Sequence, residues 1–153
     1  MKQAIIAAVA VGLCVAGAAG AQETSRPSAA EIIAARQAAF QMSGATYGGM
    51  KPVIDSGGSV KVLAFGTGGL KKWSSALPSM FPAGTGPEAG VPTKAKAEIW
   101  TNRADFEAKA AAYQAAAARL HELAQADDAA GFAAQWAAVR QTCQACHDAY
   151  RSQ

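Results

Sequence analysis

The most constraining feature of the sequence is a Cys-x-x-Cys-His motif at residues 143–147, close to the C-terminus. This spacing is typical of the attachment site of a c-type haem. Its two thiols can add to the two vinyl groups of one porphyrin, and imidazole is a standard ligand for haem iron. On a helix, Cys143, Cys146 and His147 crowd onto one side. The motif therefore predicts a chain that folds around one covalently attached haem, with His147 as the iron ligand.

Two other chemistries use closely spaced cysteines. A redox-active dithiol of the thioredoxin type follows a strand in a βαβ unit, whereas the residues around Cys143 are rich in alanine and predict a helix. A structural zinc site needs two further ligands. The sequence has no second cysteine pair, and its only other histidine is His121. The pattern favours haem over both, and we expect His121 at the surface or rim rather than on a metal.

The first 21 residues have the pattern of a secretory signal peptide. Lys2 precedes an apolar run over residues 5–15, and the small residues at 19–21 are suited to cleavage. The run is too short to span a bilayer as a helix. We therefore predict a signal peptide at 1–21 and a mature domain at 22–153, located in the bacterial periplasm.

The charge of the chain is nearly balanced. It has 14 Lys or Arg and 11 Asp or Glu. Lys2 leaves with the signal, and two haem propionates would bring the net charge close to zero. The basic residues are scattered along the sequence, which gives no indication of nucleic-acid binding. Cys14 also leaves with the signal, so the mature chain keeps only the two thiols of the motif.

Four segments carry helical patterns, and none shows the alternation of a strand. Ser28 and Glu31 form a capping box at the start of the first segment. The second segment is weaker, because it contains three glycines that each cost about 1 kcal/mol relative to alanine. Asp127 and Asp128 end the third segment and cap the fourth. The four predicted helices lie at about 29–50, 59–77, 102–126 and 129–151.

The connections between these segments differ in length. Pro52 and the turn residues at 55–58 predict the first connection. Prolines and glycines over 78–92 predict a long irregular crossover, followed by a short helical turn within 93–100. Four helices with one long crossover predict an all-α, antiparallel four-helix bundle with the haem near the C-terminal helix.

Arg36 lies on the apolar side of the first predicted helix, in line with Ile33 and Phe40. An arginine on an inward face needs a partner, and a haem propionate could supply one through a charge-assisted pair. In the other interpretation the side chain extends along the helix and places its guanidinium in water.

In its C-terminal haem motif and its four predicted helices, the chain resembles the class II c-type cytochromes, specifically the cytochromes c′. That family carries its haem motif near the end of the fourth helix and continues it with an aromatic and a basic residue, here Tyr150 and Arg151. The similarity covers essentially the whole predicted mature chain. Other matching stretches are Phe81–Thr85, Glu98–Trp100 with Phe106, and Arg36-Gln37.

The resemblance implies a five-coordinate, high-spin iron held by His147, with an apolar residue of the first helix over its other face. Here that residue is Phe40. It also implies a non-enzymatic protein that binds NO or CO, transfers single electrons, or does both. Arg151 would lie beside the proximal face, near the place where NO can replace the histidine in this family.

Three further residues come into consideration as haem contacts. Arg36 and Gln37 match the family on the first helix. Glu88 either reaches a propionate or lies in a solvated loop. The family also tends to form homodimers through its first two helices.

The alternative to an open iron site is a six-coordinate, low-spin electron carrier with a methionine as sixth ligand. Low-spin relatives carry methionine at the position of Phe40. Met42 is the nearest methionine, but two residues turn it roughly 200° away around the helix, and we expect Met50 in the core. Peroxidase-like catalysis would need a distal acid–base residue, which Phe40 is not.

Overall fold

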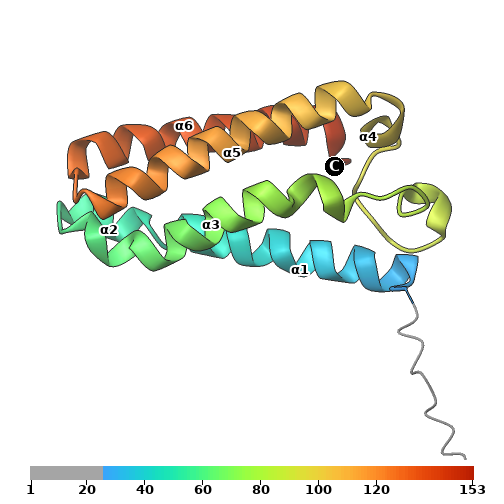
Figure 1. Cartoon of the computed structure of the whole chain (residues 1–153), viewed down its shortest axis with the longest axis horizontal. Helices are drawn as coiled ribbons and strands as arrows, with labels where there is room; N and C mark the ends of the chain where they lie inside the picture. The colour runs from blue at the N-terminus through green and yellow to red at the C-terminus, as the bar shows by residue number, and fades with distance from the viewer. Residues whose placement is uncertain (1–25) are drawn as a thin grey trace, which may run out of the picture.

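The computed structural model describes residues 26–153, so the predicted signal peptide at 1–21 lies outside the described residues. Four long helices form an antiparallel bundle, with α1 beside α3 in one layer and α5 beside α6 in the other (Figure 1). No strand occurs in the described part of the chain, and the predicted all-α bundle is confirmed. The α-helices are α1 (Ala29–Gly48), α2 (Lys51–Ser56), α3 (Ala64–Ala76), α4 (Glu98–Thr101), α5 (Arg103–Gln125) and α6 (Ala129–Tyr150). Three 3₁₀ turns accompany them: η1 (Val60–Leu63), η2 (Leu77–Met80) and η3 (Pro87–Ala89).

The capping box at the start of α1 is present as predicted. The Ser28 hydroxyl accepts from the Glu31 amide at 3.2 Å, and the Glu31 carboxylate accepts from the Ser28 amide at 2.7 Å. The helix ends at Gly48, two residues before the predicted end. Pro52 does not break the chain there, because it lies in the first turn of α2, where its missing N–H leaves no hydrogen bond unmade.

The glycines of α3 lie where neighbouring helices come close. A Cβ at Gly66 would stand 3.2 Å from the Thr46 side chain on α1, and a Cβ at Gly68 would stand 3.3 Å from His121 on α5. Close approach on two sides therefore offsets the weak helix propensity of these residues. His121 is partly buried, and its Nδ1 lies 3.0 Å from the Thr67 hydroxyl, so it joins α3 to α5.

The junction between α5 and α6 follows the prediction. Asp127 adopts a left-handed φ of 56°, and its carboxylate accepts from the Ser59 hydroxyl at 2.9 Å and the Lys61 amide at 3.0 Å. Asp128 caps α6 by accepting from the Gly131 amide at 2.9 Å. Both aspartates therefore fix this end of the bundle.

Three long-range contacts hold the crossover against α4 and the start of α5. The Trp100 indole N–H donates to the Pro82 carbonyl at 3.0 Å. The Arg103 guanidinium donates to the carbonyls of Phe81 and Pro78 at 3.1 and 2.9 Å. The short helical turn predicted at 93–100 begins later, at Glu98. The crossover is thereby folded back over one end of the bundle.

The helices do not pack equally tightly around the bundle. Close contacts join α5 to α6, α3 to α5, and α1 to α3, whereas α1 and α6 are not a closely packed pair. The core therefore leaves a space on the side between α1 and α6. Within residues 26–153, none of the helices has the length and apolar character needed to cross a membrane.

Candidate cofactor site

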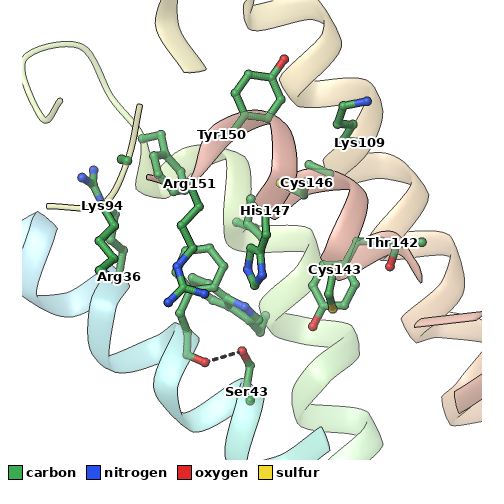
Figure 2. A pocket seen from close by; sticks show the side chains of 18 of the residues that line it. Arg36, Ser43, Lys94, Lys109, Thr142, Cys143, Cys146, His147, Tyr150 and Arg151 are labelled. Carbon is green, nitrogen blue, oxygen red and sulfur yellow. Dashed lines mark hydrogen bonds between the residues drawn. The ribbon is translucent and has the colours of Figure 1, made fainter. Parts of the chain in front are cut away.

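A cavity of about 710 Å³ lies inside the bundle and is lined by residues of α1, α3, α5 and α6 and of the crossover. This volume is in the range of sites that enclose a cofactor. Cys143, Cys146 and His147 all line it from α6, and Figure 2 shows them on adjoining turns of that helix. The three residues singled out by the motif therefore share one cavity.

The electrostatics of the motif suit covalent attachment rather than dithiol redox chemistry. Both cysteines are free thiols, and burial raises the pKa of the Cys143 and Cys146 thiols. Redox-active cysteines of the thioredoxin type have lowered values. Burial, with a smaller contribution from the charge of Arg151, lowers the pKa of His147. The imidazole is therefore neutral at pH 7, which is the form that binds a metal.

Aromatic side chains form the wall from the α1 and α3 sides. Phe40 is partly buried in this wall. Its ring centroid lies 5.1 Å from that of Trp73 and 6.2 Å from that of Phe81, both in edge-to-face geometry. Such pairs are held by more than the area they bury. Phe40 is therefore supported by two other rings at the place where the resemblance puts the distal cap.

Arg36 is fully enclosed, with only 2% of its surface exposed. Its guanidinium donates to the hydroxyls of Thr85 at 3.0 Å and Thr93 at 2.9 Å, and lies 4.6 Å from the centroid of Phe81. Burial lowers its pKa, and the charge of Glu88 partly opposes this. The interpretation in which Arg36 extends into water is therefore wrong, because the threonines and the aromatic ring hold it inside.

The enclosed charge of Arg36 has no carboxylate partner in the described part of the chain, where four ion pairs occur and none includes it. A buried cation is expensive unless an anion compensates it. Arg36 also lines the cavity. An anionic group of a bound cofactor, such as a carboxylate, would meet this requirement.

The remaining predicted site residues lie at different distances from the cavity. Gln37 is exposed at its edge and donates to the Pro92 carbonyl at 3.0 Å. Glu88 is exposed, accepts from the Gly86 amide at 3.1 Å and does not line the cavity. Arg151 lines it, and Figure 2 shows its side chain beside His147. Of the two alternatives for Glu88, its exposed position outside the cavity lining favours a solvated loop residue over a propionate contact.

Several residues of the site were missed in the sequence. Thr85 and Thr93 lie 49 and 57 residues from Arg36, and no local pattern connects them to it. Trp73 was expected only in the core, yet it lines the cavity. Its indole N–H is buried and has no hydrogen-bond partner among the described residues. These contacts join segments that meet only in the folded chain, so the sequence indicated Trp73 as a core aromatic and gave no sign of the threonines.

None of the methionines in the described residues lines the cavity. Met42 is 71% exposed on α1, and Met50 is 1% exposed in the core, as expected. Met80 packs partly buried against the core. The sulfur and imidazole donors of the cavity lining are therefore the two thiols and one imidazole of α6, which face aromatic rings and an enclosed arginine.

This arrangement fits a haem attached through Cys143 and Cys146. The thiols and the neutral imidazole of His147 share one wall, the opposite wall is apolar, and Arg36 supplies an enclosed positive charge for a propionate.

Comparison with known proteins agrees with this fit. Residues 31–151 match the sequence profile of a family described as "Cytochrome C'". The chain belongs to the cytochrome c′ family. This confirms the resemblance seen in the motif, and with it the cofactor, because the family carries covalently bound haem c. Its members are haem proteins that bind gases or transfer electrons and are not enzymes.

The relatives include cytochromes c′ of two bacteria. The one from Alcaligenes xylosoxydans xylosoxydans is 33% identical over 117 residues, which cover 76% of this chain and 89% of the relative. The one from Pararhodospirillum photometricum is 40% identical over 76 residues, 49% of this chain and 58% of the relative. The latter match spans little more than half of that protein's length.

Solved structures show the same fold. One is the nitric oxide complex of a mutant cytochrome c prime from Alcaligenes xylosoxidans, with a TM-score of 0.75 and 28% identity over 84% of this chain and 98% of that one. A second, described as cytochrome c′, has a TM-score of 0.74 and 27% identity. It covers 83% of this chain and 99% of the other.

Proposed function

We propose that this chain is a periplasmic haem protein with a five-coordinate, high-spin iron that binds NO and CO and exchanges single electrons. In this proposal Cys143 and Cys146 hold the haem, His147 is the proximal ligand, and Phe40 covers the distal side. The observation that carries it is the meeting of these four residues in one cavity.

When bound, the haem supplies an iron centre that can take a diatomic ligand or change its charge by one electron. The protein residues set the conditions for this chemistry. His147 offers a neutral nitrogen, since its pKa is lowered by burial. Phe40, Trp73 and Phe81 make a wall that disfavours water. Arg36 is placed to hold a propionate, with Gln37 at the edge of the cavity.

The position of the methionines supports an open sixth site. The alternative carrier with a methionine sixth ligand requires a methionine sulfur inside the cavity, and Met42, Met50 and Met80 all lie elsewhere. Phe40 is instead an apolar cap that a small neutral molecule can displace. Relatives whose solved structures are nitric oxide complexes support NO as a ligand. Arg151 lies beside His147, where it would influence a ligand on the proximal side.

We further propose that the signal peptide at 1–21 directs the chain to the periplasm and that the mature protein is a homodimer. Within residues 26–153, the large exposed apolar side chains are Met42 on α1, Val62 in η1 and Phe65 on α3, the last 96% exposed. A surface of this kind on the first two long helices supports an interface there. Sedimentation analysis of the protein and of a Phe65→Ser variant tests it. A dimer that Phe65→Ser weakens is expected, and a monomeric parent protein would contradict the proposal.

An absorption spectrum of the purified protein, ferric and ferrous, with and without CO, tests the main proposal. We expect haem retained under denaturing conditions, a high-spin spectrum and a clear change on adding CO to the ferrous form. A low-spin spectrum unaffected by CO would instead establish the six-coordinate electron carrier. Loss of haem under denaturing conditions would contradict both.

A further inference from the structure

The charged side chains that line the cavity are all of one sign. Five lining residues are lysine or arginine, and none of the lining residues is aspartate or glutamate. In the sequence these cations are scattered from position 36 to position 151, and they gave no sign of a cluster. The fold brings them together. They are Arg36, Lys94, Lys109, Arg140 and Arg151.

Two of these cations have another role. Arg36 is enclosed and bonded to two threonines. The Lys109 ammonium lies 3.5 Å from the Asp105 carboxylate. Lys94, Arg140 and Arg151 are exposed, and none of the ion pairs found in residues 26–153 includes them. Two propionates would offset only two of the five positive charges in the lining.

Backbone contacts place Lys94 next to Arg151, and Arg140 lines the same cavity from an earlier turn of α6. The Ser152 amide donates to the Lys94 carbonyl at 2.9 Å, and Ala95 pairs with Arg151 in an isolated bridge. Lys94 is therefore fastened beside the end of α6. Arg140 lies on the same helix, seven residues before His147, or about 10 Å along its axis. We call Lys94, Arg140 and Arg151 the cationic rim.

We propose that the cationic rim is the docking surface for an electron-transfer protein whose contact face is acidic. The inference rests on the proposed haem site, because one electron passes between that partner and the iron while no bond forms or breaks. Charge complementarity carries it: three exposed positive charges, which form no ion pair among the described residues, line the cavity of the redox centre. Fields of this kind raise the association rates of oppositely charged partners by about 10- to 1,000-fold at low salt.

The first experiment locates an anion on the surface without any electron transfer. Hexacyanochromate(III), a redox-inert paramagnetic trianion, is titrated into ¹⁵N-labelled ferrous CO-bound protein, with diamagnetic hexacyanocobaltate(III) as the reference. We expect amide broadening around residues 93–95, Arg140 and Arg151. Broadening centred on Lys71 and Lys72 of α3, or spread evenly over the surface, would overturn the proposal.

The second experiment measures electron transfer. Ferricyanide oxidises the ferrous protein by taking one electron and becoming ferrocyanide, and stopped-flow absorbance follows the rate. We expect the double variant Lys94→Gln Arg140→Gln to react roughly three- to tenfold more slowly at 10 mM ionic strength. The difference should nearly vanish at 0.5 M, where screening is almost complete. With tris(phenanthroline)cobalt(III), a cationic oxidant, the same variant should react faster.

A matched control removes two lysines from another face. The double variant Lys71→Gln Lys72→Gln has the same change in net charge but lies on α3, outside the cavity lining. If both double variants slow oxidation equally, the cause is the net charge of the protein. That result would overturn the proposal that the cationic rim is the docking surface. Failure of the haem site itself would be seen separately, as an altered spectrum or CO response before any oxidant is added.

Discussion

Tyr47 on α1 and Trp136 on α6 bind each other twice. The Tyr47 hydroxyl donates to the Trp136 carbonyl at 2.8 Å, and the Trp136 indole donates to the Tyr47 carbonyl at 3.1 Å. Their rings stack with centroids 4.7 Å apart and planes 1° from parallel. This pair joins α1 to α6 at one end of the cavity, between two helices that are otherwise held apart.

Replacing Tyr47 by Phe should therefore weaken the fold. The change keeps the stacked ring but removes the hydrogen bond from the hydroxyl to the Trp136 carbonyl, so we expect the free energy of unfolding to fall by about 1 kcal/mol. Denaturant unfolding followed by far-ultraviolet circular dichroism measures this loss. An unchanged midpoint would show that water replaces the hydroxyl.

Phe40→Ala should open the distal side of the cavity. Without the ring, CO no longer has to displace a packed side chain, and we expect its association rate to rise roughly tenfold, equivalent to ~1.4 kcal/mol of barrier. Flash photolysis of the ferrous CO form gives this rate. Met42→Ala is the control, because Met42 is two residues away but 71% exposed. Equal association rates in all three proteins would contradict the proposal that Phe40 covers the distal side.

Arg36→Gln should lower the reduction potential. Loss of an enclosed positive charge near a propionate favours the ferric state by about 1 kcal/mol, on the order of 50 mV for one electron. Arg36→Lys keeps the charge and should change the potential less. Spectroelectrochemical titration compares the three proteins. If both variants shift the potential equally, the geometry of the guanidinium rather than its charge is responsible.

Alkaline pH should destabilise the protein through tyrosines whose pKa is raised by burial, two of which also donate hydrogen bonds in the fold. Burial raises the pKa of Tyr47 to about 12, and burial together with the hydrogen bond to Asp105 raises that of Tyr150 to about 12. Both hydroxyls act as donors in the fold. Because these values lie above that of an unfolded tyrosine, about 10, the stabilisation is complete below pH 10 and is lost as the pH rises toward 12.

Unfolding midpoints between pH 8 and 12 test this dependence. Tyr150→Phe should be less stable than the parent at pH 8 and should lose less stability as the pH rises. Parallel curves for the two proteins would assign the alkaline loss to other groups.

Two glycines of α3 offer a matched pair of substitutions. A Cβ at Gly69 meets nothing within 4 Å, so Gly69→Ala should stabilise the protein by about 1 kcal/mol. At Gly66 the same Cβ stands 3.2 Å from Thr46, and this crowding should remove most or all of that gain. Thermal unfolding of both variants gives the comparison. A larger gain for Gly66→Ala would contradict the close packing of α1 on α3.

Much of the fold could be predicted because its signals are local. The Ser28–Glu31 capping box, the Asp127-Asp128 junction and the apolar periodicity each depend on residues within one or two helical turns. The prediction of the first connection was inaccurate because a proline is compatible with two different local structures. Pro52 either breaks a helix or starts one, and the result depends on where the preceding helix ends.

The sequence by itself determined the cofactor chemistry, because Cys143, Cys146 and His147 lie within five consecutive residues of one helix. Tertiary structure decided the environment of that chemistry. It enclosed Arg36 between two threonines of the distant crossover and gathered Lys94, Arg140 and Arg151 on one rim. The physical reason is distance along the chain: attachment needs only neighbours on one helix, whereas burial and the electric field at the cavity depend on segments that meet only when the bundle has folded.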